Sequence, residues 1–216
     1  AKGTVRPEQK WSVSTAEYCR ICLEPGNAGE YLATLEENFE DWADRKIEYD
    51  YDAILKEKAA EFERFYESMP SVPAVYADAA RVAAYVDWAS IVAPCGVLKR
   101  ESMFMSKNWM CNVWSWDHCF NAMALAYHNP KEAWDQFLVM FDFQKPSGNI
   151  PDSVNDAKII HNYCKPPIHG WTLRKLMGIM AISHEQLMEA YEKLSKWTYW
   201  LSLIHISEPT RHLRIS

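Results

Sequence analysis

The period of the apolar residues changes once along this chain, and that change constrains the fold more than any other feature. Before residue 30 the pattern is typical of strands: Trp11–Ser14 alternates, Tyr18–Leu23 is rich in β-prone residues, and Pro25–Asn27 has the composition of a turn. From Gly29 onward the apolar residues recur at helical spacing. The sequence therefore predicts a short β segment followed by a long α-helical part.

The helical part divides into successive amphipathic runs. Proline and glycine mark the breaks, and Asn129 followed by Pro130 supplies a favourable N-cap and first helical residue. The predicted helices cover residues 34–45, 53–66, 76–92, 117–127, 130–141, 170–183 and 184–200. Helices that follow one another so closely predict an array of helical hairpins with functional loops between them.

Composition excludes two classes of partner. The chain has 216 residues, 49% of them apolar, so it can bury a sizeable core. A net charge of −6 without a basic stripe argues against nucleic acid, and no apolar run approaches the roughly 20 residues that span a bilayer. We therefore expect no nucleic-acid or membrane partner.

The six cysteines do not form a recognisable metal or redox motif. Cys19 and Cys22 make a C-x-x-C pair, but no second pair with similar spacing completes a zinc site, and Glu24–Gly26 interrupts the helix that a thioredoxin-like motif needs. We interpret the cysteines as buried, reduced thiols and predict no metal and no cofactor. Reduced thiols and the lack of a visible signal peptide favour the cytoplasm.

Both ends of the chain look incomplete. The first residue is Ala1 rather than Met. Residues 201–216 resemble the translation of a transposon-based sequencing adapter, so we predict that they are non-native and that the natural sequence was cut at Trp200. We further predict that a chain cut there exposes apolar helix faces and is poorly soluble.

Three polar islands lie in the aromatic second half of the chain: residues 112–118, 148–152 and 165–171. Indole faces beside carboxylates and amides are suited to pyranose rings, which offer an apolar face and paired hydroxyls. A simpler interpretation makes the tryptophans core residues, Asp117 a helix cap and the second island a turn. The candidate substrate-binding residues are Trp114, Trp116, Asp117, His118, Asn149, Asp152, Lys165, His169 and Trp171.

In the third island, Pro166 and Pro167 favour an extended segment before a helix that starts near Trp171. Such a rigid segment would hold Lys165, His169 and Trp171 in place.

Three motifs in order resemble the catalytic domain of glycoside hydrolase family 63 and its mannosylglycerate-hydrolase-like relatives. They are Trp-x-Trp-Asp at 114–117, Gly-x-Ile-Pro-Asp at 148–152 and Pro-Pro-Ile-His-Gly-Trp at 166–171. The likeness is good over residues 100–200 and weaker before them. It implies a mainly α fold: residues 31–200 would be the N-terminal part of an (α/α)6 toroid of six helical hairpins. Residues 1–30 would be a short remnant of a preceding β-sandwich.

The resemblance also implies the hydrolysis of an α-linked glucoside or mannoside with inversion, by one carboxylic acid and one carboxylate base. The family's acid motif, Ser-Gly-x-Asp, and its late glutamate base do not occur in this sequence. Asp117 is therefore expected to bind sugar rather than to act as the acid, and the 216-residue chain alone is expected to be inactive. Many relatives have Gln where this chain has Lys165, which leaves the sugar preference open.

Two other classes of protein fit parts of the pattern. A terpene cyclase also has helices rich in aromatic residues, but its Asp-Asp-x-x-Asp magnesium motif is missing. A non-catalytic carbohydrate-binding or scaffold protein on the same toroid remains the alternative to a glycosidase.

Overall fold

The computed structural model describes residues 4–12, 15–26, 29, 31–33, 50–106, 109–127 and 129–206. They form two compact units, residues 1–54 and residues 55–216. The predicted helix at 34–45 lies outside the described residues.

The first unit contains a long antiparallel β-ribbon. Strand β1 (Thr4–Ser12) pairs with β2 (Thr15–Glu24) from Thr4↔Glu24 to Ser12↔Thr15, with a register shift between Lys10 and Trp11. Cross-strand ion pairs such as Arg20–Glu8 stabilise it, and large apolar side chains such as Trp11 remain exposed. The predicted strands are confirmed. The β-sandwich stays a prediction, because two strands alone have no buried face.

The prediction of buried cysteines is wrong for Cys19 and Cys164, which are exposed, whereas Cys119 is buried. Cys19 and Cys22 both lie in β2. Residues three apart in a strand point to opposite faces, so this pair is not arranged to chelate one ion.

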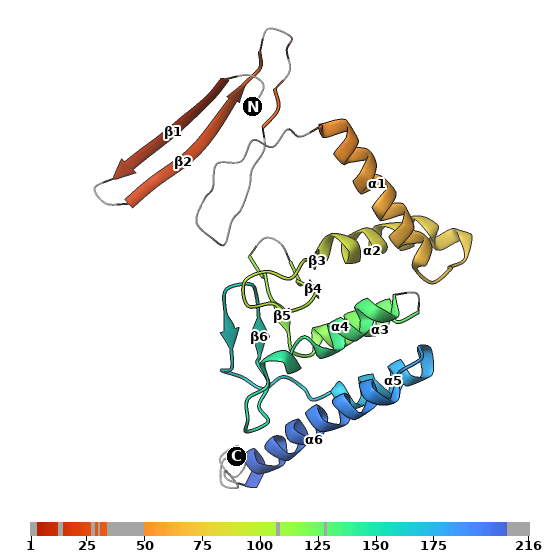
Figure 1. Ribbon diagram of the computed structural model, residues 1–216. Coiled ribbons are helices and arrows are strands. Elements are labelled where there is room, and N and C mark those ends of the chain that lie inside the picture. Colours follow the sequence, from red (N-terminus) through yellow and green to blue (C-terminus); the bar gives the residue numbers. More distant parts are fainter. Residues whose placement is uncertain are drawn as a thin grey trace. The chain divides into compact units, whose positions relative to one another are not determined.

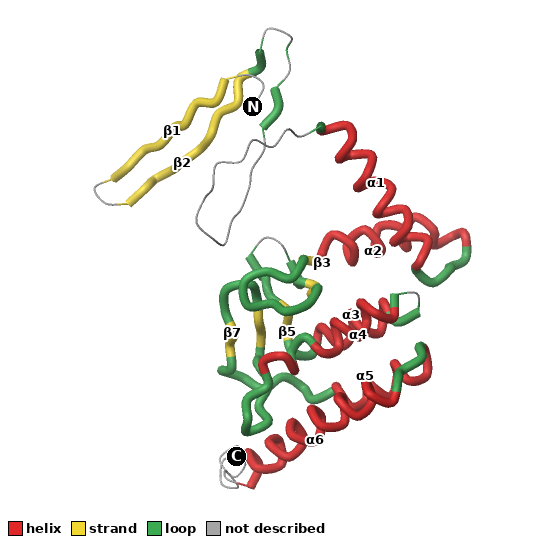
Figure 2. The backbone as a smooth tube through the Cα atoms, viewed as in Figure 1, coloured by secondary structure: helices red, strands yellow, loops and turns green. Residues whose placement is uncertain are grey.

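Six α-helices form most of the described part of the second unit (Figures 1 and 2). Helix α1 is Tyr51–Ser68, α2 is Ala77–Ser90, α3 is Asp117–Leu125, α4 is Pro130–Leu138, α5 is His169–Ile179 and α6 is His184–Ile206. The short strands are β3 (Ile91–Val92), β4 (Ser102–Met103), β5 (Val113–Trp114), β6 (Ser153–Val154) and β7 (Ile159–Ile160), and 3-10 turns cover Ala74–Tyr76 and Phe141–Phe143.

Local chemistry explains several helix ends. The Asp50 carboxylate accepts a hydrogen bond from Ala53 N (3.1 Å) at the start of α1. Before α6, Ser183 and Gln186 form a capping box, with Ser183 N to Gln186 Oε1 at 2.9 Å and Gln186 N to Ser183 Oγ at 3.2 Å. Each bond satisfies a backbone N–H that has no partner inside the helix.

The helices pack as consecutive pairs. The Phe62 ring of α1 lies 5.6 Å from Tyr85 and 5.5 Å from Trp88 of α2, and Arg81 pairs with Glu63 between the same helices. Helix α3 packs on α4 and α5, and α5 packs on α6, so these four helices lie side by side (Figure 1). Their shared core includes Leu125, Phe137, Leu138, Met140, Ile150 and Leu176, all almost fully buried. This confirms the mainly α class.

Polar contacts tie the loop before β4 to α4 and to the 3-10 turn after it. The Arg100 guanidinium makes two hydrogen bonds to Asp142 (2.6 and 2.7 Å) and one to Asp135 (3.0 Å). The fully buried Gln136 side chain accepts from Met103 N (2.9 Å) and donates to Glu101 O (3.0 Å). Because both amide atoms have partners, a polar side chain is tolerated in this core.

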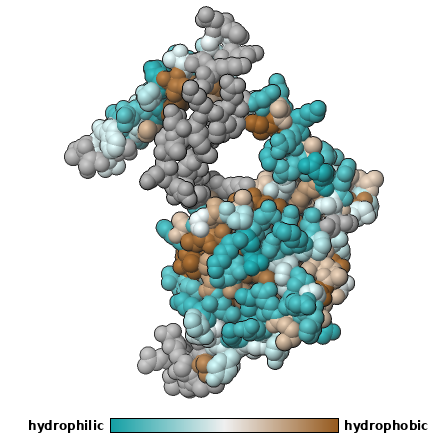
Figure 3. Space-filling view, in the orientation of Figure 1, coloured by the Kyte–Doolittle hydropathy of each residue, from teal (hydrophilic) through white to brown (hydrophobic). Residues whose placement is uncertain are grey.

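Helix α6 continues past Trp200 to Ile206. The non-native origin of residues 201–216 stays a prediction. No described helix is long and apolar enough to cross a bilayer. Apolar side chains do reach the surface of the second unit, as Figure 3 shows for one face, and Tyr191, Tyr199 and Trp171 are among the exposed ones.

Candidate functional site

A small sheet joins the first and second islands. Strand β5, which contains Trp114, pairs antiparallel with β6, and β6 pairs with β7. Beyond the paired residues, Ser115 N donates to Asp152 O (2.9 Å) and Asp152 N donates to Ile160 O (2.7 Å). Residues separated by almost forty positions are therefore fixed next to each other by backbone hydrogen bonds. In Figure 1, β5 and β6 lie at one end of the helices α3–α6.

The third island meets the other two through Lys165. Its Nζ lies 3.3 Å from Asp152 Oδ1 and 4.9 Å from the centroid of the Trp114 ring. The positive charge of Lys165 also favours the ionised form of the Asp117 carboxyl group, although it is not the largest influence on that pKa. We call Trp114, Asp117, Asp152 and Lys165 the Lys165 cluster; it contains one residue or more from each island.

Burial and charge oppose each other in the Lys165 cluster. The pKa of Asp117 is raised above its ordinary value because partial burial disfavours the carboxylate, and this outweighs a local backbone hydrogen bond and Lys165. The Asp152 side chain is only 5% exposed, and that of Lys165 is 30% exposed. Asp152 and Lys165 neutralise each other, so the cluster carries at most one net negative charge, which comes from Asp117 when that carboxyl group is ionised.

The second island combines a turn with one cluster residue. Gly148 has φ = 100°, and the turn closes with Gly148 N to Lys145 O and Lys145 N to Asn149 O, both 2.8 Å. The Gln144 amide donates to Gly148 O (3.0 Å) and to Lys193 O of α6 (2.9 Å). Asn149, which is half-buried, therefore takes part in the turn through its backbone carbonyl. Asp152 is the residue of the second island that belongs to the Lys165 cluster.

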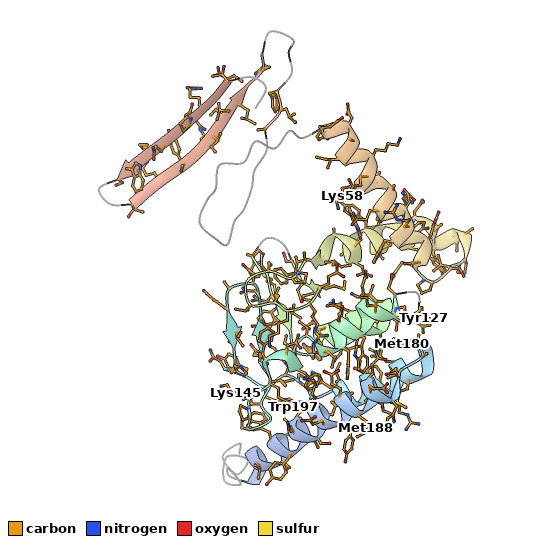
Figure 4. The ribbon with its side chains drawn as sticks, viewed as in Figure 1. Lys58, Tyr127, Lys145, Met180, Met188 and Trp197 are labelled. Atoms are coloured by element: carbon orange, nitrogen blue, oxygen red, sulfur yellow. The ribbon has the colours of Figure 1, made fainter. Side chains whose placement is uncertain are left out.

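The two other tryptophans have different surroundings. Trp116 immediately precedes α3, is 37% exposed and lies edge-on to Phe120 at 6.2 Å. Trp171 borders a separate surface depression with Tyr127 and has Lys175 Nζ 5.6 Å from its ring. Figure 4 shows Tyr127 at the opposite end of the helices from Lys145. Trp116 is therefore next in sequence to Asp117 of the Lys165 cluster, whereas Trp171 lies at a separate depression.

The two predicted histidines are buried beneath the surface. His118 and His169 are at most 1% exposed, and their rings lie 5.1 Å apart. Burial lowers the pKa of His118 to about 4 and that of His169 to about 3, so both are neutral at pH 7. Helix α5 begins at His169, one residue before the predicted helix at 170–183, so His169 lies in the helix rather than in the extended segment before it. Neither ring reaches the solvent in this structure.

Two features of the structure were not predicted from the sequence: a cavity and a contact between His118 and Cys119. A cavity of about 770 Å³ lies among α1, α2 and α4 and is bordered by Glu101 and Glu132; it contains none of the nine predicted site residues. Cys119 lies directly against His118, with Sγ 3.7 Å from Nε2. The adjacent positions of His118 and Cys119 were the available signal for this contact.

Helical hairpins that carry a tryptophan–carboxylate–lysine cluster at the ends of their loops fit the sugar-binding side of a carbohydrate-active enzyme. Residues 110–209, which include all three islands, match the sequence profile of the mannosylglycerate hydrolase MGH1-like glycoside hydrolase domain. This match confirms the resemblance seen in the three motifs and supports a glycoside hydrolase domain over residues 110–209. No curated protein matches the chain.

Proposed function

We propose that this chain supplies part of the sugar-binding subsite of an inverting α-glycosidase that acts on an α-linked glucoside or mannoside. The observation that supports this most is the position of Lys165, which contacts Trp114 and Asp152 at once and so joins all three islands. A set of core tryptophans and isolated turns would not need an ammonium between an indole and a carboxylate.

Each group has a distinct role in the proposed subsite. The exposed ring of Trp116 offers a platform for the C–H face of a pyranose. Asp117 accepts hydrogen bonds from sugar hydroxyls, and Lys165 donates one while Asp152 keeps its ammonium in place. His118 and His169 support the subsite from below, since both are buried.

The charges favour a neutral sugar ring at this position. Lys165 and Asp152 neutralise each other, and the remaining carboxyl group, Asp117, would repel an anionic substituent when ionised. We therefore place the glycone, rather than a charged aglycone such as the glycerate of mannosylglycerate, against the Lys165 cluster.

The proposal assigns hydrogen bonding, not bond cleavage, to Asp117 and Asp152. An inverting enzyme needs a carboxylic acid and a carboxylate about 6.5–9.5 Å apart across the scissile bond, with a water between base and sugar. Asp152 is ion-paired and almost fully buried, which suits positioning better than proton transfer. We propose that the acid and base belong to other parts of the family's domain and that this chain alone does not hydrolyse glycosides.

Sugar binding tests the proposal directly. Methyl α-D-mannopyranoside and methyl α-D-glucopyranoside are titrated into the chain while ligand saturation-transfer NMR and tryptophan fluorescence are recorded. We expect saturation transfer to one of these sugars, and loss of most of it in Lys165→Met and Trp116→Ala. Trp171→Ala is the matched control and should keep the signal, because Trp171 borders a separate surface depression.

Two results would count against the proposal. Equal loss in the Trp171 and Lys165 variants would show that binding does not depend on the Lys165 cluster. Release of the aryl group from an aryl α-glucoside or α-mannoside by the purified chain would show that it holds its own acid and base.

A further inference from the structure

Three side chains that can bind a metal ion lie close together at the starts of α3 and α5. A ring nitrogen of His118, a ring nitrogen of His169 and Cys119 Sγ all lie within 4.8 Å of one another. All three residues are buried: His118 and Cys119 are 0% exposed and His169 is 1% exposed. His118 and Cys119 lie in the first turn of α3 and His169 is the first residue of α5, so the trio joins two helices.

The orientation of His118 leaves one nitrogen free to bind. Its Nδ1 lies 3.0 Å from Trp114 O, and a carbonyl oxygen can only accept, so Nδ1 carries the hydrogen. The lone pair is then on Nε2, which is the atom that faces Cys119 Sγ at 3.7 Å. A backbone carbonyl that fixes the outer nitrogen is the usual support of a metal-bound histidine.

His169 makes no well-formed hydrogen bond through either ring nitrogen. Among the described residues, neither Nδ1 nor Nε2 has a partner of standard hydrogen-bond geometry, although the ring is almost completely buried and the backbone of Ser115 interacts with it. Its ring neighbours are His118, Phe141 and Trp197, and the last two lie edge-on at 5.5 and 6.2 Å. A buried imidazole without well-formed hydrogen bonds loses those that water would supply. A metal ion bound to one of the two ring nitrogens would therefore stabilise the fold.

We propose that His118, Cys119 and His169 form a His2Cys site for a thiophilic d10 cation, Zn²⁺ or Cu⁺. Metal–nitrogen bonds of about 2.0–2.1 Å and a metal–sulfur bond of about 2.3 Å place the donor atoms roughly 3.3–3.8 Å apart in a tetrahedron. The observed spread, up to 4.8 Å, requires side-chain movements of only about 1 Å. One thiolate and two imidazoles, without a carboxylate, select zinc or copper over magnesium or calcium.

The metal in this site is structural. The site is buried and joins the start of α3 to the start of α5. The first island ends in α3, and the third island ends in α5. Binding would hold Trp114 and Lys165 in their relative positions without touching the sugar. The inference does not depend on carbohydrate binding and is tested separately from it.

Cobalt titration of the purified chain tests the site. All variants carry Cys19→Ser, Cys22→Ser, Cys95→Ser, Cys111→Ser and Cys164→Ser, because exposed or half-exposed thiols elsewhere would also bind metal. We expect one Co²⁺ per chain, a thiolate-to-cobalt charge-transfer band in the near ultraviolet, and displacement by Zn²⁺. Competition between Zn²⁺ and Cu⁺ then identifies the preferred cation.

Cys119→Ser and His169→Gln should each weaken binding at least about 10-fold, and metal addition should raise their melting temperatures less than that of the parent. His184→Ala is the control and should behave like the parent, because His184 lies outside the trio. A thiolate band that persists in Cys119→Ser, or no band in the parent, would overturn the proposal.

X-ray absorption of the zinc-loaded parent gives a readout that does not require folded variants. We expect one sulfur at about 2.3 Å and nitrogens at about 2.0–2.1 Å. A first shell of oxygen and nitrogen alone would refute a site that includes Cys119.

Discussion

Replacing Gly148 by alanine should destabilise the second unit, because two independent features of the structure exclude a side chain there. The backbone has φ = 100°, which non-glycine residues rarely adopt. A Cβ at this position would also lie 2.1 Å from Lys196 O and 2.7 Å from Lys196 C of α6. These are backbone atoms in a helix, so they cannot rotate away, and the turn would have to separate from α6.

The expected magnitude combines backbone strain with overpacking. A non-glycine residue in such a conformation costs about 1–3 kcal/mol, and forcing extra volume into a packed position costs about 1–3 kcal/mol more. Together these costs amount to about 2–6 kcal/mol, which for a unit of this size, at roughly 2–4 °C per kcal/mol, lowers the melting temperature by roughly 4–24 °C. The same shift should release the two bonds from the Gln144 amide to Gly148 O and Lys193 O.

Thermal and urea unfolding, followed by circular dichroism and tryptophan fluorescence, measure this effect. Trp197 of α6 is close enough to report it: Figure 4 shows it beside the turn that carries Lys145. Gly178→Ala is the matched control, because Gly178 lies in α5 and a methyl group added there would have no other atom within 4 Å. That change should stabilise by about 0.5–1 kcal/mol, since alanine favours helix more than glycine.

If Gly148→Ala lowers the free energy of unfolding while Gly178→Ala raises it, the same glycine-to-alanine change has opposite effects at the two positions. That result would support the packing of the turn on α6. If Gly148→Ala melted within about 1 °C of the parent while remaining folded, both the positive φ and the contact with Lys196 would be refuted.

Three further predictions concern the interior. Arg100→Met leaves the buried Asp142 carboxylate without its two hydrogen bonds and should cost about 3–5 kcal/mol in urea unfolding, whereas Lys131→Met, at an exposed ion pair, should cost less than about 1 kcal/mol. Gln136→Leu leaves Met103 N and Glu101 O unpaired and should cost about 2–4 kcal/mol; a neutral result would mean that water or another group replaces the amide. Burial is the main cause that raises the pKa of Glu132, and the negative charge of Glu101 adds to it. The ionised Glu132 therefore lowers the free energy of unfolding at pH values above its pKa, and this loss disappears as the pH falls. Glu132→Gln should therefore be more stable than the parent at pH 7, with a difference that shrinks as the pH is lowered toward the ordinary carboxyl range; a difference that grows in acid would reverse the assignment.

The sequence predicted the elements whose signals are local. Periodicity predicted the helices at 53–66, 76–92, 117–127, 130–141, 170–183 and 184–200 close to α1–α6, with ends that differ by a few residues. Asn129–Pro130 marks the start of α4 as predicted. A helix end is less certain than its body, because a cap or a 3-10 turn such as Phe141–Phe143 changes only one or two backbone bonds.

The sequence assigned nine candidate residues to one sugar-binding site, and their role in binding stays a prediction. Trp114, Asp117, Asp152 and Lys165 do come together, but the sequence alone did not show that Asn149 serves the turn or that Trp171 borders another depression. The prediction of buried cysteines failed at Cys19 and Cys164, since an isolated two-stranded ribbon and an exposed loop have no interior in which to place them.

What this sequence determined by itself is therefore the helical class, the positions of the loops and the three motifs of a glycoside hydrolase domain, because each depends on residues close together in the chain. Only the tertiary structure decided which loop residues share a site. Lys165 reaches Asp152 and Trp114 because β5 and β6 pair across almost forty residues, and His118, Cys119 and His169 converge because α3 packs on α5. Such contacts depend on packing between distant segments, which the order of residues along one helix or strand does not specify.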